Sequence, residues 1–435
     1  MNIKKEVILL REENKQLKGI IEKQNKLIEE LQERLKKVEF KLKKKYKPDF
    51  IKTDVKRKKK KTGRKKGHEG SGRRSPEDIH EEKYHELCEC PECGGKNLSD
   101  VQKIRERVTT DIPEKQEAIN TKHLIERKYC RDCKKVVEAR VPEALPNSQF
   151  ALRLMIFVMY LKITMRLPSN KVTELMWSMY RIKISDGEVY RILEQLSEAF
   201  GDYYEELKQK IINAKMKNID ETGHRVNGIN HWLWVFINKE VALYEISRKR
   251  NNDVPTETLG NQEGKFFGSD RHILYNKFKK RTGAKQQICE THALRNSKDL
   301  ADYHPEAKYV HKRLKTIFRK AKEGRTSKEQ LLKWIDRIAT SRIYTSSIVY
   351  KFVRSICKDH REDLFRFVDE PGIDSSNNIA ERGLRHPVVM RKISHGNRSQ
   401  KGADITKRLL SVTETVKLNH SSPLAAMGNI LNISK

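Results

Sequence analysis

The chain has 435 residues, a length that suggests about three domains rather than one. Lys and Arg outnumber Asp and Glu by 92 to 59, and the formal charge of +33 favours a polyanionic partner, most commonly nucleic acid. No run approaches the roughly 20 apolar residues of a membrane span and no small-residue cleavage site follows the N-terminus, so we expect no membrane partner. A ribosome-associated or simply soluble basic protein is the alternative to a DNA-binding one.

Residues 1–45 contain a seven-residue repeat of apolar positions that predicts a coiled coil. Ile, Val or Leu fill most of one repeated position and Leu most of the other, with Glu and Lys at the flanks. Ile or Val at the first position favours two parallel strands, and the polar Asn14 in the same seam would fix their register. A helix packed on its own chain is the alternative. We expect this segment to join the protein into a homodimer or a higher oligomer.

Residues 46–80 form a basic, glycine-containing segment that we expect to be a flexible linker. Clustered like charges repel one another and leave little apolar surface to bury, so the free segment should be disordered. A solvated spacer is one interpretation, but an arm that binds phosphates or enters a minor groove fits the charge of the whole chain better. The predicted DNA contacts of this linker are Lys58, Lys59, Lys60, Arg64, Lys65 and Lys66.

Residues 81–145 contain two Cys-x-x-Cys pairs in a stretch rich in strand-forming residues. Four thiolates are the ligands of a tetrahedral structural Zn²⁺, and two such pairs in one small segment are typical of a zinc ribbon. Redox pairs are the alternative, but they usually occur singly. The odd total of seven cysteines also suits a reducing cytoplasm better than secreted disulfides. The predicted ligands of one Zn²⁺ are Cys90, Cys93, Cys130 and Cys133, with Cys88 left outside the set.

Residues 146–214 have apolar residues at helical spacing. Two helices, over 170–180 and 186–200, are predicted on either side of a tight turn, and Ser185 with Glu188 forms a capping box at the start of the second. Helices joined in this way are either a helix-turn-helix, whose second helix would present Arg191 to DNA, or an ordinary helical hairpin. The pattern favours neither.

Residues 215–295 change to strand patterns. An Asn-Gly pair at 227–228 is a strong hairpin signal between the first two strands. Three antiparallel strands, a helical crossover and a fourth strand are the opening of an RNase H-like sheet, in which Asp220 and Asp270 would lie at neighbouring strand positions. The predicted strands are 216–223, 231–237, 241–246 and 265–270.

Three carboxylates, Asp220, Asp270 and Glu381, are the predicted catalytic residues. Mg²⁺ prefers oxygen ligands, and two such ions about 3.5–4 Å apart activate the attacking oxygen and stabilise the leaving oxygen of a phosphoryl displacement. We expect the three carboxylates to hold two Mg²⁺ (or Mn²⁺) ions, with Glu381 on a helix that begins at Asp374 or Ser375. Basic residues around that helix are predicted contacts to the DNA backbone: Arg382, Arg385, Arg391, Lys392 and Arg398.

Three blocks of the chain resemble the catalytic blocks of the insertion sequence 66 family of transposases: Asp220–Gly223, Ser269–Arg271 and Asn377–Arg385. That family also has a coiled N-terminal region, a basic linker and a zinc-binding domain before its core, so the resemblance covers nearly the whole chain. It implies a metal-binding triad of Asp220, Asp270 and Glu381. It also implies cutting and joining of double-stranded DNA at the ends of a mobile element, in which water hydrolyses a phosphodiester and the freed 3′-hydroxyl attacks target DNA.

The expected fold is a multidomain α+β protein with an N-terminal coiled coil, a zinc ribbon, a helical DNA-binding region and an RNase H-like α/β core. A helical insertion over 296–370 would interrupt that core, and 371–435 would complete it and end in a helix. The resemblance further implies a prokaryotic, cytoplasmic and nucleoid-associated protein. The competing classes are an RNA-guided or other RNase H-like nuclease and an inactive zinc-ribbon regulator.

Cys289 and His292 form a Cys-x-x-His motif that resembles a signature of several transposase cores. Two ligands are too few for a metal site. We therefore interpret the motif as a structural or DNA-contacting pair.

Overall fold

The computed structural model describes residues 12, 16–25, 27–32, 78–106, 108–110 and 118–431 of a chain that divides into two compact units, 1–111 and 112–435. Residues 12, 16–25 and 27–32 are helical, as predicted, and the apolar side chains of this helix are exposed. The rest of the predicted coiled coil lies outside the described residues. So do the six basic residues of the predicted DNA-binding linker: Lys58, Lys59, Lys60, Arg64, Lys65 and Lys66.

The cysteine segment predicted over 81–145 crosses the division between the two units. In the first unit, the described residues from 78 to 110 form a turn at Cys90–Gly95 but no helix or strand. In the second, β1 (Arg127–Cys130) and β2 (Lys135–Glu138) form an antiparallel hairpin. Of the described residues from 78 to 145, none is buried, so little apolar packing holds this segment.

Four helices follow, and the predicted capping box is confirmed. The Ser185 hydroxyl accepts the Glu188 N–H at 3.2 Å, and the Glu188 carboxylate accepts the Ser185 N–H at 2.7 Å. The second helix of the pair buries Val189 and Ile192 and exposes Arg191, so the hairpin and helix-turn-helix interpretations both stay open. The helices are α2 (Leu152–Met159, continued by a π-helical turn, Tyr160–Thr164), α3 (Ser169–Tyr180), α4 (Asp186–Ala199) and α5 (Gly201–Asn213).

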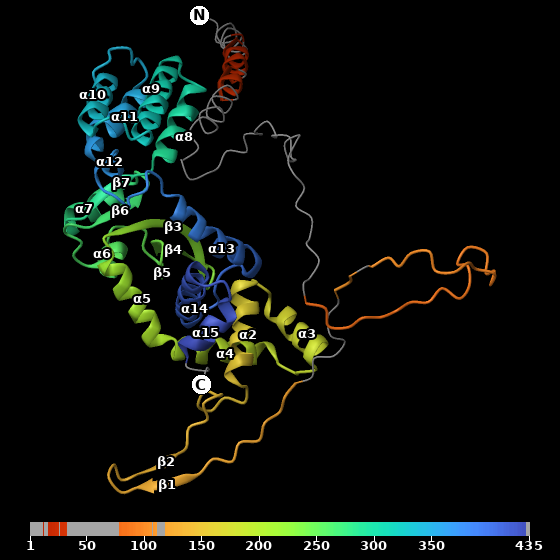
Figure 1. Ribbon diagram of the computed structural model, residues 1–435. Coiled ribbons are helices and arrows are strands. Elements are labelled where there is room, and N and C mark those ends of the chain that lie inside the picture. Colours follow the sequence, from red (N-terminus) through yellow and green to blue (C-terminus); the bar gives the residue numbers. More distant parts are fainter. Residues whose placement is uncertain are drawn as a thin grey trace, which may run out of the picture. The chain divides into compact units, whose positions relative to one another are not determined.

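A five-stranded sheet lies at the centre of this unit, in the order β5-β4-β3-β6-β7 (Figure 1). The first three strands are antiparallel, and β6 and β7 run parallel to β3. Positive φ angles at Asn227 and Gly228 make the predicted hairpin turn. The strands are β3 (Met216–Val226), β4 (Ile229–Ile237), β5 (Ala242–Ser247), β6 (Phe266–Ser269) and β7 (Lys285–Ile288); the crossovers are α6 (Asp253–Leu259) and α7 (Ile273–Thr282).

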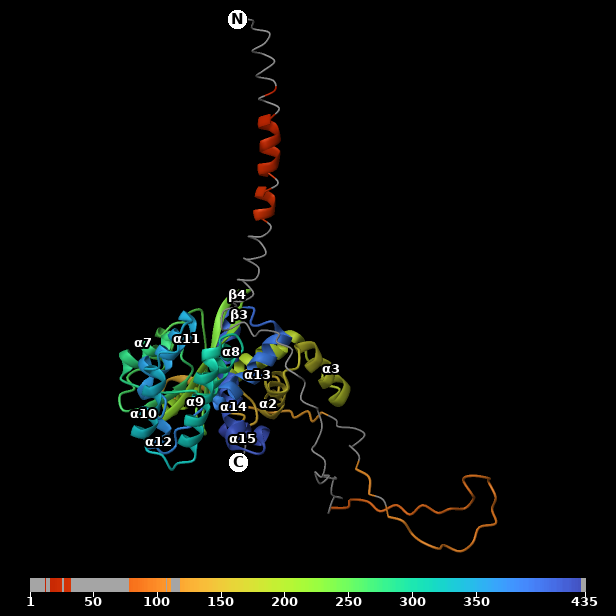
Figure 2. The ribbon, with the colours of Figure 1, turned by 90° about the horizontal axis from the view of Figure 1, so that it is seen from above.

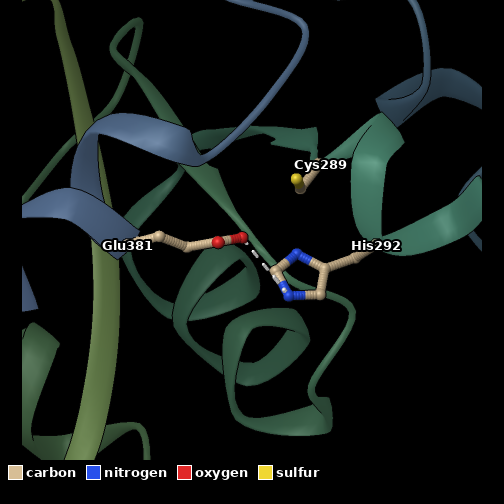
Figure 3. Close-up of side chains that lie close together, drawn as sticks. All are labelled: Cys289, His292 and Glu381. Carbon is tan, nitrogen blue, oxygen red and sulfur yellow. Dashed lines mark ion pairs between the residues drawn. The ribbon is translucent and has the colours of Figure 1, made fainter. Parts of the chain in front are cut away.

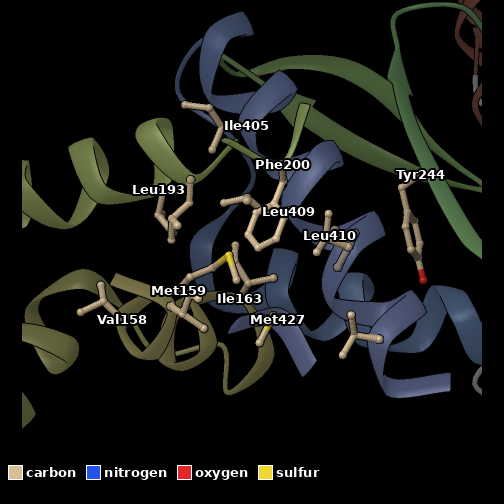
Figure 4. Packing of buried hydrophobic residues seen from close by; sticks show 14 of the residues in the cluster. Val158, Met159, Ile163, Leu193, Phe200, Tyr244, Ile405, Leu409, Leu410 and Met427 are labelled. Atoms are coloured by element: carbon tan, nitrogen blue, oxygen red, sulfur yellow. The ribbon is translucent and has the colours of Figure 1, made fainter. Parts of the chain in front are cut away.

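Both faces of the sheet are covered, which explains why β4 is apolar along most of its length. Leu233 and Val235 face a core formed with α2, α4 and α14, whereas Trp234 and Phe236 face a core formed with α5, α6 and α7. This alternation is the two-residue period of a strand. Figure 4 shows part of the first core, where Phe200 and Leu409 pack among side chains from distant segments.

The region predicted to be a helical insertion is largely helical and has a core of its own. Its first helix, α8, begins at Glu290, so the proposed boundary between 295 and 296 lies inside a helix. In both views α9–α12 gather on one side of the sheet (Figures 1 and 2). The elements are α8 (Glu290–Ala301), α9 (Pro305–Lys322), α10 (Lys328–Ala339), α11 (Ser347–Arg354), a π-helical turn (Ser355–Asp359), a 3₁₀ turn (Arg361–Asp363) and α12 (Arg366–Asp369).

Three helices close the fold: α13 (Asn378–Ser394), α14 (Gln400–Asn419) and α15 (Pro423–Ile430). The sequence predicted that the first of them would start at Asp374 or Ser375, but it begins at Asn378. The side chain of the preceding residue, Asn377, bonds to β3 and does not cap the helix. Among the described helices, none combines the length and the apolar character that crossing a membrane requires.

Candidate active site

Asp220 and Asp270 come from adjacent parallel strands. The register pairs Asn218 of β3 with Gly268 of β6, and each aspartate follows two residues later, Asp220 within β3 and Asp270 immediately after the end of β6. Because side chains two residues apart on a strand point to the same face, the two carboxyl groups leave neighbouring points of the sheet. Asp220 accepts the N–H of Glu221 at 2.9 Å, and Asp270 accepts the N–H of His272 at 2.9 Å. The charge of Asp270 is among the causes that raise the pKa of Asp220, in keeping with this arrangement.

The electrostatics of this site are those of crowded carboxyl groups. Burial, together with the nearby charges of Glu221 and Asp270, raises the pKa of Asp220 to about 8. Burial and the charge of Asp270 also raise the pKa of Glu221. Carboxylates held this close in a poorly hydrated place repel one another, and a bound cation would relieve that repulsion.

Glu221 is a residue that the sequence did not single out for a separate role. Its carboxylate accepts the Nε–H of Arg250 at 3.0 Å and the hydroxyl of Tyr275 at 2.5 Å, and only 3% of its side chain is exposed. Arg250 in turn stacks on Trp232, with 4.2 Å between the guanidinium carbon and the ring centroid. Glu221 is therefore committed to partners within the protein. The pairing depends on residues far along the chain, which the Asp-Glu pair itself does not indicate.

Asn377 fastens the start of α13 to β3, beside Asp220. Its amide nitrogen donates to the Ile219 carbonyl at 3.0 Å, and its amide oxygen accepts from Asn218 at 2.8 Å. A Cβ at Gly268 would collide with the Asn218 amide, so glycine at this position allows the bond. Because the Asn377 side chain bonds to the neighbouring strand, it does not cap the helix. This contact fixes the residue immediately before α13, and the first turn of that helix carries Glu381.

Glu381 lies in the first turn of α13 and faces the Cys-x-x-His motif (Figure 3). Its Oε1 is 3.6 Å from Nε2 of His292. One ligand atom each of Cys289, His292 and Glu381 lie within 4.8 Å of one another. The sequence paired only Cys289 with His292; the structure adds a third potential ligand. No local signal could have found it, since Glu381 reaches the motif from a separate helix.

The pKa of His292 responds to both Glu381 and Asp270. The neighbouring Cys289 thiol raises the pKa of His292, and the charges of Glu381 and Asp270 act in the same direction. For Cys289, burial acts to raise the pKa of the thiol, but the His292 imidazole and the Asn377 N–H outweigh burial and leave it lowered. The influence of Asp270 and Glu381 on one imidazole indicates that the motif borders the carboxylates of the predicted triad.

The predicted basic contacts follow Glu381 along the chain. Arg391 is half-buried and burial lowers its pKa, and the loop after it pairs with the β3–β4 hairpin through the Asn227 N–H and the Asn397 carbonyl at 2.8 Å. Arg382, Arg385 and Lys392 are exposed on α13, and Arg398 is exposed in the loop. These side chains are available to an external polyanion.

Each predicted zinc-binding pair has its own local geometry. The backbone N–H groups of Glu92 and Cys93 lower the pKa of Cys90, and those of Cys133 and Asp132 lower the pKa of Cys130. Amide groups aimed at sulfur stabilise a thiolate, the form that binds metal. The pair Cys90 and Cys93 belongs to the first unit, and the pair Cys130 and Cys133 belongs to the second.

A comparison with known protein families finds a match over most of the second unit. The family model described as Transposase IS66 family matches residues 147–405, more than half of the chain. The matched range includes all three predicted carboxylates and the Cys-x-x-His motif, and it begins after the cysteine segment. No curated protein matches the chain.

Proposed function

The chain belongs to the IS66 family of transposases, and from that premise we propose that it cuts and joins DNA at the ends of a mobile element with Asp220, Asp270 and Glu381 as its catalytic carboxylates. The observation that supports the proposal is that strand pairing and side-chain bonds join the three segments that carry these residues. Asp220 and Asp270 follow the parallel register of β3 and β6, and the bonds of Asn377 join the start of α13, the helix that carries Glu381, to β3. The strand order is that of an RNase H-like sheet, which supports this fold for the core.

The residues present fit a pair of Mg²⁺ or Mn²⁺ ions. The three carboxylates supply hard oxygen donors, and the buried Oε1 of Glu381 has no hydrogen-bond partner among the described residues. When bound, two such ions would stabilise charge on the attacking and leaving oxygens of a phosphodiester. The raised pKa of Asp220 agrees with a site whose negative charge needs a cation.

The protein's own side chains would position the DNA. Exposed Arg382, Arg385, Lys392 and Arg398, with Arg391 beside them, would neutralise phosphates next to the carboxylates and orient a strand for attack by water. The same arrangement would then orient the freed 3′-hydroxyl toward target DNA. Glu221 would keep the Asp220 strand in place through Arg250 and Tyr275.

The N-terminal regions would serve recognition and assembly. We include one structural Zn²⁺ on Cys90, Cys93, Cys130 and Cys133, which the donor-rich turns around both pairs support. The linker over 46–80 would bind DNA through its lysines and arginines. The exposed seam of the N-terminal helix, with Leu17, Ile21 and Leu31 each more than half exposed, supports pairing with a second chain.

The test uses purified full-length protein, DNA carrying the element ends, and Mg²⁺. Asp270→Asn should abolish strand cleavage and leave binding to the element ends intact, because the change removes one negative oxygen without altering shape. Asp299→Asn, an exposed aspartate of α8, is the matched control and should cleave like the wild type. Cleavage by Asp270→Asn at the wild-type rate would contradict the proposal. Copurifying guide RNA would instead favour an RNA-guided nuclease, and binding without cleavage by the wild type would favour a regulator.

A further inference from the structure

Cys289 and His292 are held side by side by the way α8 begins. Cys289 is the N-cap of that helix and His292 is its third residue, the two positions that face each other in a capping box. No side-chain capping bond forms here. The thiol and the imidazole are therefore free to face the same neighbour. That neighbour is Glu381 of α13, and ligand atoms of the three residues lie within 4.8 Å of one another (Figure 3).

Two atoms of this cluster are buried without a hydrogen bond. Within the described part of the chain, neither Nδ1 of His292 nor Oε1 of Glu381 forms a hydrogen bond, and the contact of Oε1 with Nε2 of His292 is 3.6 Å long. Buried polar atoms almost always form a hydrogen bond, so two atoms without one in the same cluster indicate a missing ligand. The Cys289 sulfur, by contrast, accepts the Asn377 N–H at 3.2 Å. A hydrogen bond of this kind to a coordinating sulfur is a common support around protein metal sites.

The donor set identifies the class of ion. A thiolate and an imidazole select Zn²⁺ and similar thiophilic cations, whereas Mg²⁺ prefers oxygen. Three protein ligands with a fourth position open are also a usual arrangement for zinc. The set therefore differs in chemistry from the all-carboxylate triad, although the two share Glu381.

We propose that Cys289, His292 and Glu381 form a binding site for a thiophilic divalent cation, with Zn²⁺ as its representative, and that occupation of this site withdraws Glu381 from Asp220 and Asp270. The inhibitory half of this inference rests on the proposed function. Zinc would then compete with Mg²⁺ for one shared carboxylate, and cleavage would depend on the ratio of the two ions. Zinc binding itself does not depend on any activity.

The first experiment measures zinc per chain by elemental analysis after the full-length protein is loaded with Zn²⁺ and freed of excess ion. The wild type should hold one more zinc per chain than Cys289→Ser and than His292→Gln. Cys357→Ser is the matched control, since Cys357 is also buried but belongs to the insertion core. Zinc on the cysteine pairs is common to all four proteins and cancels in the comparison. Equal zinc in the wild type and in both cluster variants would overturn the inference.

Co²⁺ provides a readout that is specific for the thiolate. The absorption of a Co²⁺–thiolate bond should be stronger in the wild type than in Cys289→Ser by the contribution of one sulfur, and unchanged in Cys357→Ser. Identical spectra for the wild type and Cys289→Ser would count against a sulfur ligand and so against the site.

The inhibitory half is tested on cleavage of element-end DNA in Mg²⁺, with each protein compared with its own rate in the absence of Zn²⁺. Half-inhibition of Cys289→Ser should require roughly 100-fold more Zn²⁺ than that of the wild type, since losing a ligand costs at least as much affinity as losing a supporting residue. Equal sensitivity would overturn the inhibitory role. An extra zinc without cleavage by any protein would support the site and overturn the proposed function instead.

Discussion

The cysteine segment and the sheet-centred core differ in how much apolar surface they bury. Of the described residues from 78 to 145 none is buried, whereas Trp234, Tyr244 and Phe267 of the core are almost wholly removed from solvent. A segment that buries so little apolar surface needs another source of folding free energy, and bound metal is the usual one. The core has a large buried apolar interior of its own, so we expect a metal there to serve chemistry rather than folding. The two regions should therefore respond differently to the loss of metal.

The largest effect is expected in the cysteine segment. Cys130→Ser should release one zinc per chain and make residues 78–145 sensitive to protease, because a structural zinc contributes roughly 10–16 kcal/mol to folding. Residues 147–431 should stay resistant. Limited proteolysis followed by mass spectrometry measures both regions in one digest. Cys357→Ser should keep this zinc, and a cysteine segment that resists protease without it would break the comparison.

The next effect concerns the chemistry of the core. Asp220→Asn should slow cleavage about 1000-fold or more, since a metal ligand supplies several kcal/mol of transition-state stabilisation. The thermal midpoint of the core should stay the same or rise, because the change relieves repulsion between buried carboxylates. Asp202→Asn, an exposed aspartate of α5, serves as the control for both readouts. A marked fall in the midpoint would mean that Asp220 supports the fold rather than the reaction.

A smaller effect is expected at the contact that joins α13 to the sheet. Asn377→Ala would leave the Asn218 amide and the Ile219 carbonyl buried and unpaired, at a cost of about 2–4 kcal/mol in the free energy of unfolding. Cleavage should also fall, because the helix that carries Glu381 is no longer fixed. Denaturant unfolding and cleavage are measured together. Asn419→Ala, which removes two bonds at the exposed end of α14, should lower stability by less.

The smallest effect is expected in the pH dependence of the stability of the core. Lys217 is buried, and burial together with the charge of Lys265 lowers its pKa to about 7, from an ordinary value of about 10.4. Between these values the unfolded chain binds the proton and the folded core does not, so core stability should rise with pH, by at most about 1.4 kcal/mol per unit. Below pH 7 both states are protonated and this slope disappears.

Lys217→Met should remove that contribution and flatten the dependence of the denaturation midpoint on pH between 7 and 10. Lys285→Met, at an exposed lysine of β7, is the control and should retain the wild-type slope. The same slope in all three proteins would show that the buried amine is not its source.

Much of the fold was predictable because its signals are local. The capping box at Ser185 and the turn at Asn227–Gly228 each depend on a few adjacent residues, and both are present. The antiparallel strands follow from apolar residues with turns between them. The proximity of Asp220 and Asp270 followed from the same pattern, since a strand that returns parallel to the first brings equivalent positions together.

β7 was not predicted, and its chemistry explains why. Lys285–Ile288 is short and contains two glutamines, which indicates a loop when taken alone. In the structure both glutamines are buried. Gln286 donates to the Ser269 hydroxyl at 2.8 Å, and Gln287 donates to the Leu364 carbonyl at 3.0 Å. The side-chain N–H groups of this polar strand find acceptors only because the fold brings distant segments against it.

The sequence alone was sufficient for the antiparallel strands and their hairpin turn, for the excess of positive charge and for the choice of three candidate carboxylates, because composition and short-range spacing carry that information. They were not sufficient for the start of α13 at Asn378, for the commitment of Glu221 to Arg250 and Tyr275, or for the approach of Glu381 to Cys289 and His292. Each of these depends on which side chains packing brings together across long separations in the chain. No local pattern encodes such a contact, since its free energy exists only once the sheet and its helices have assembled.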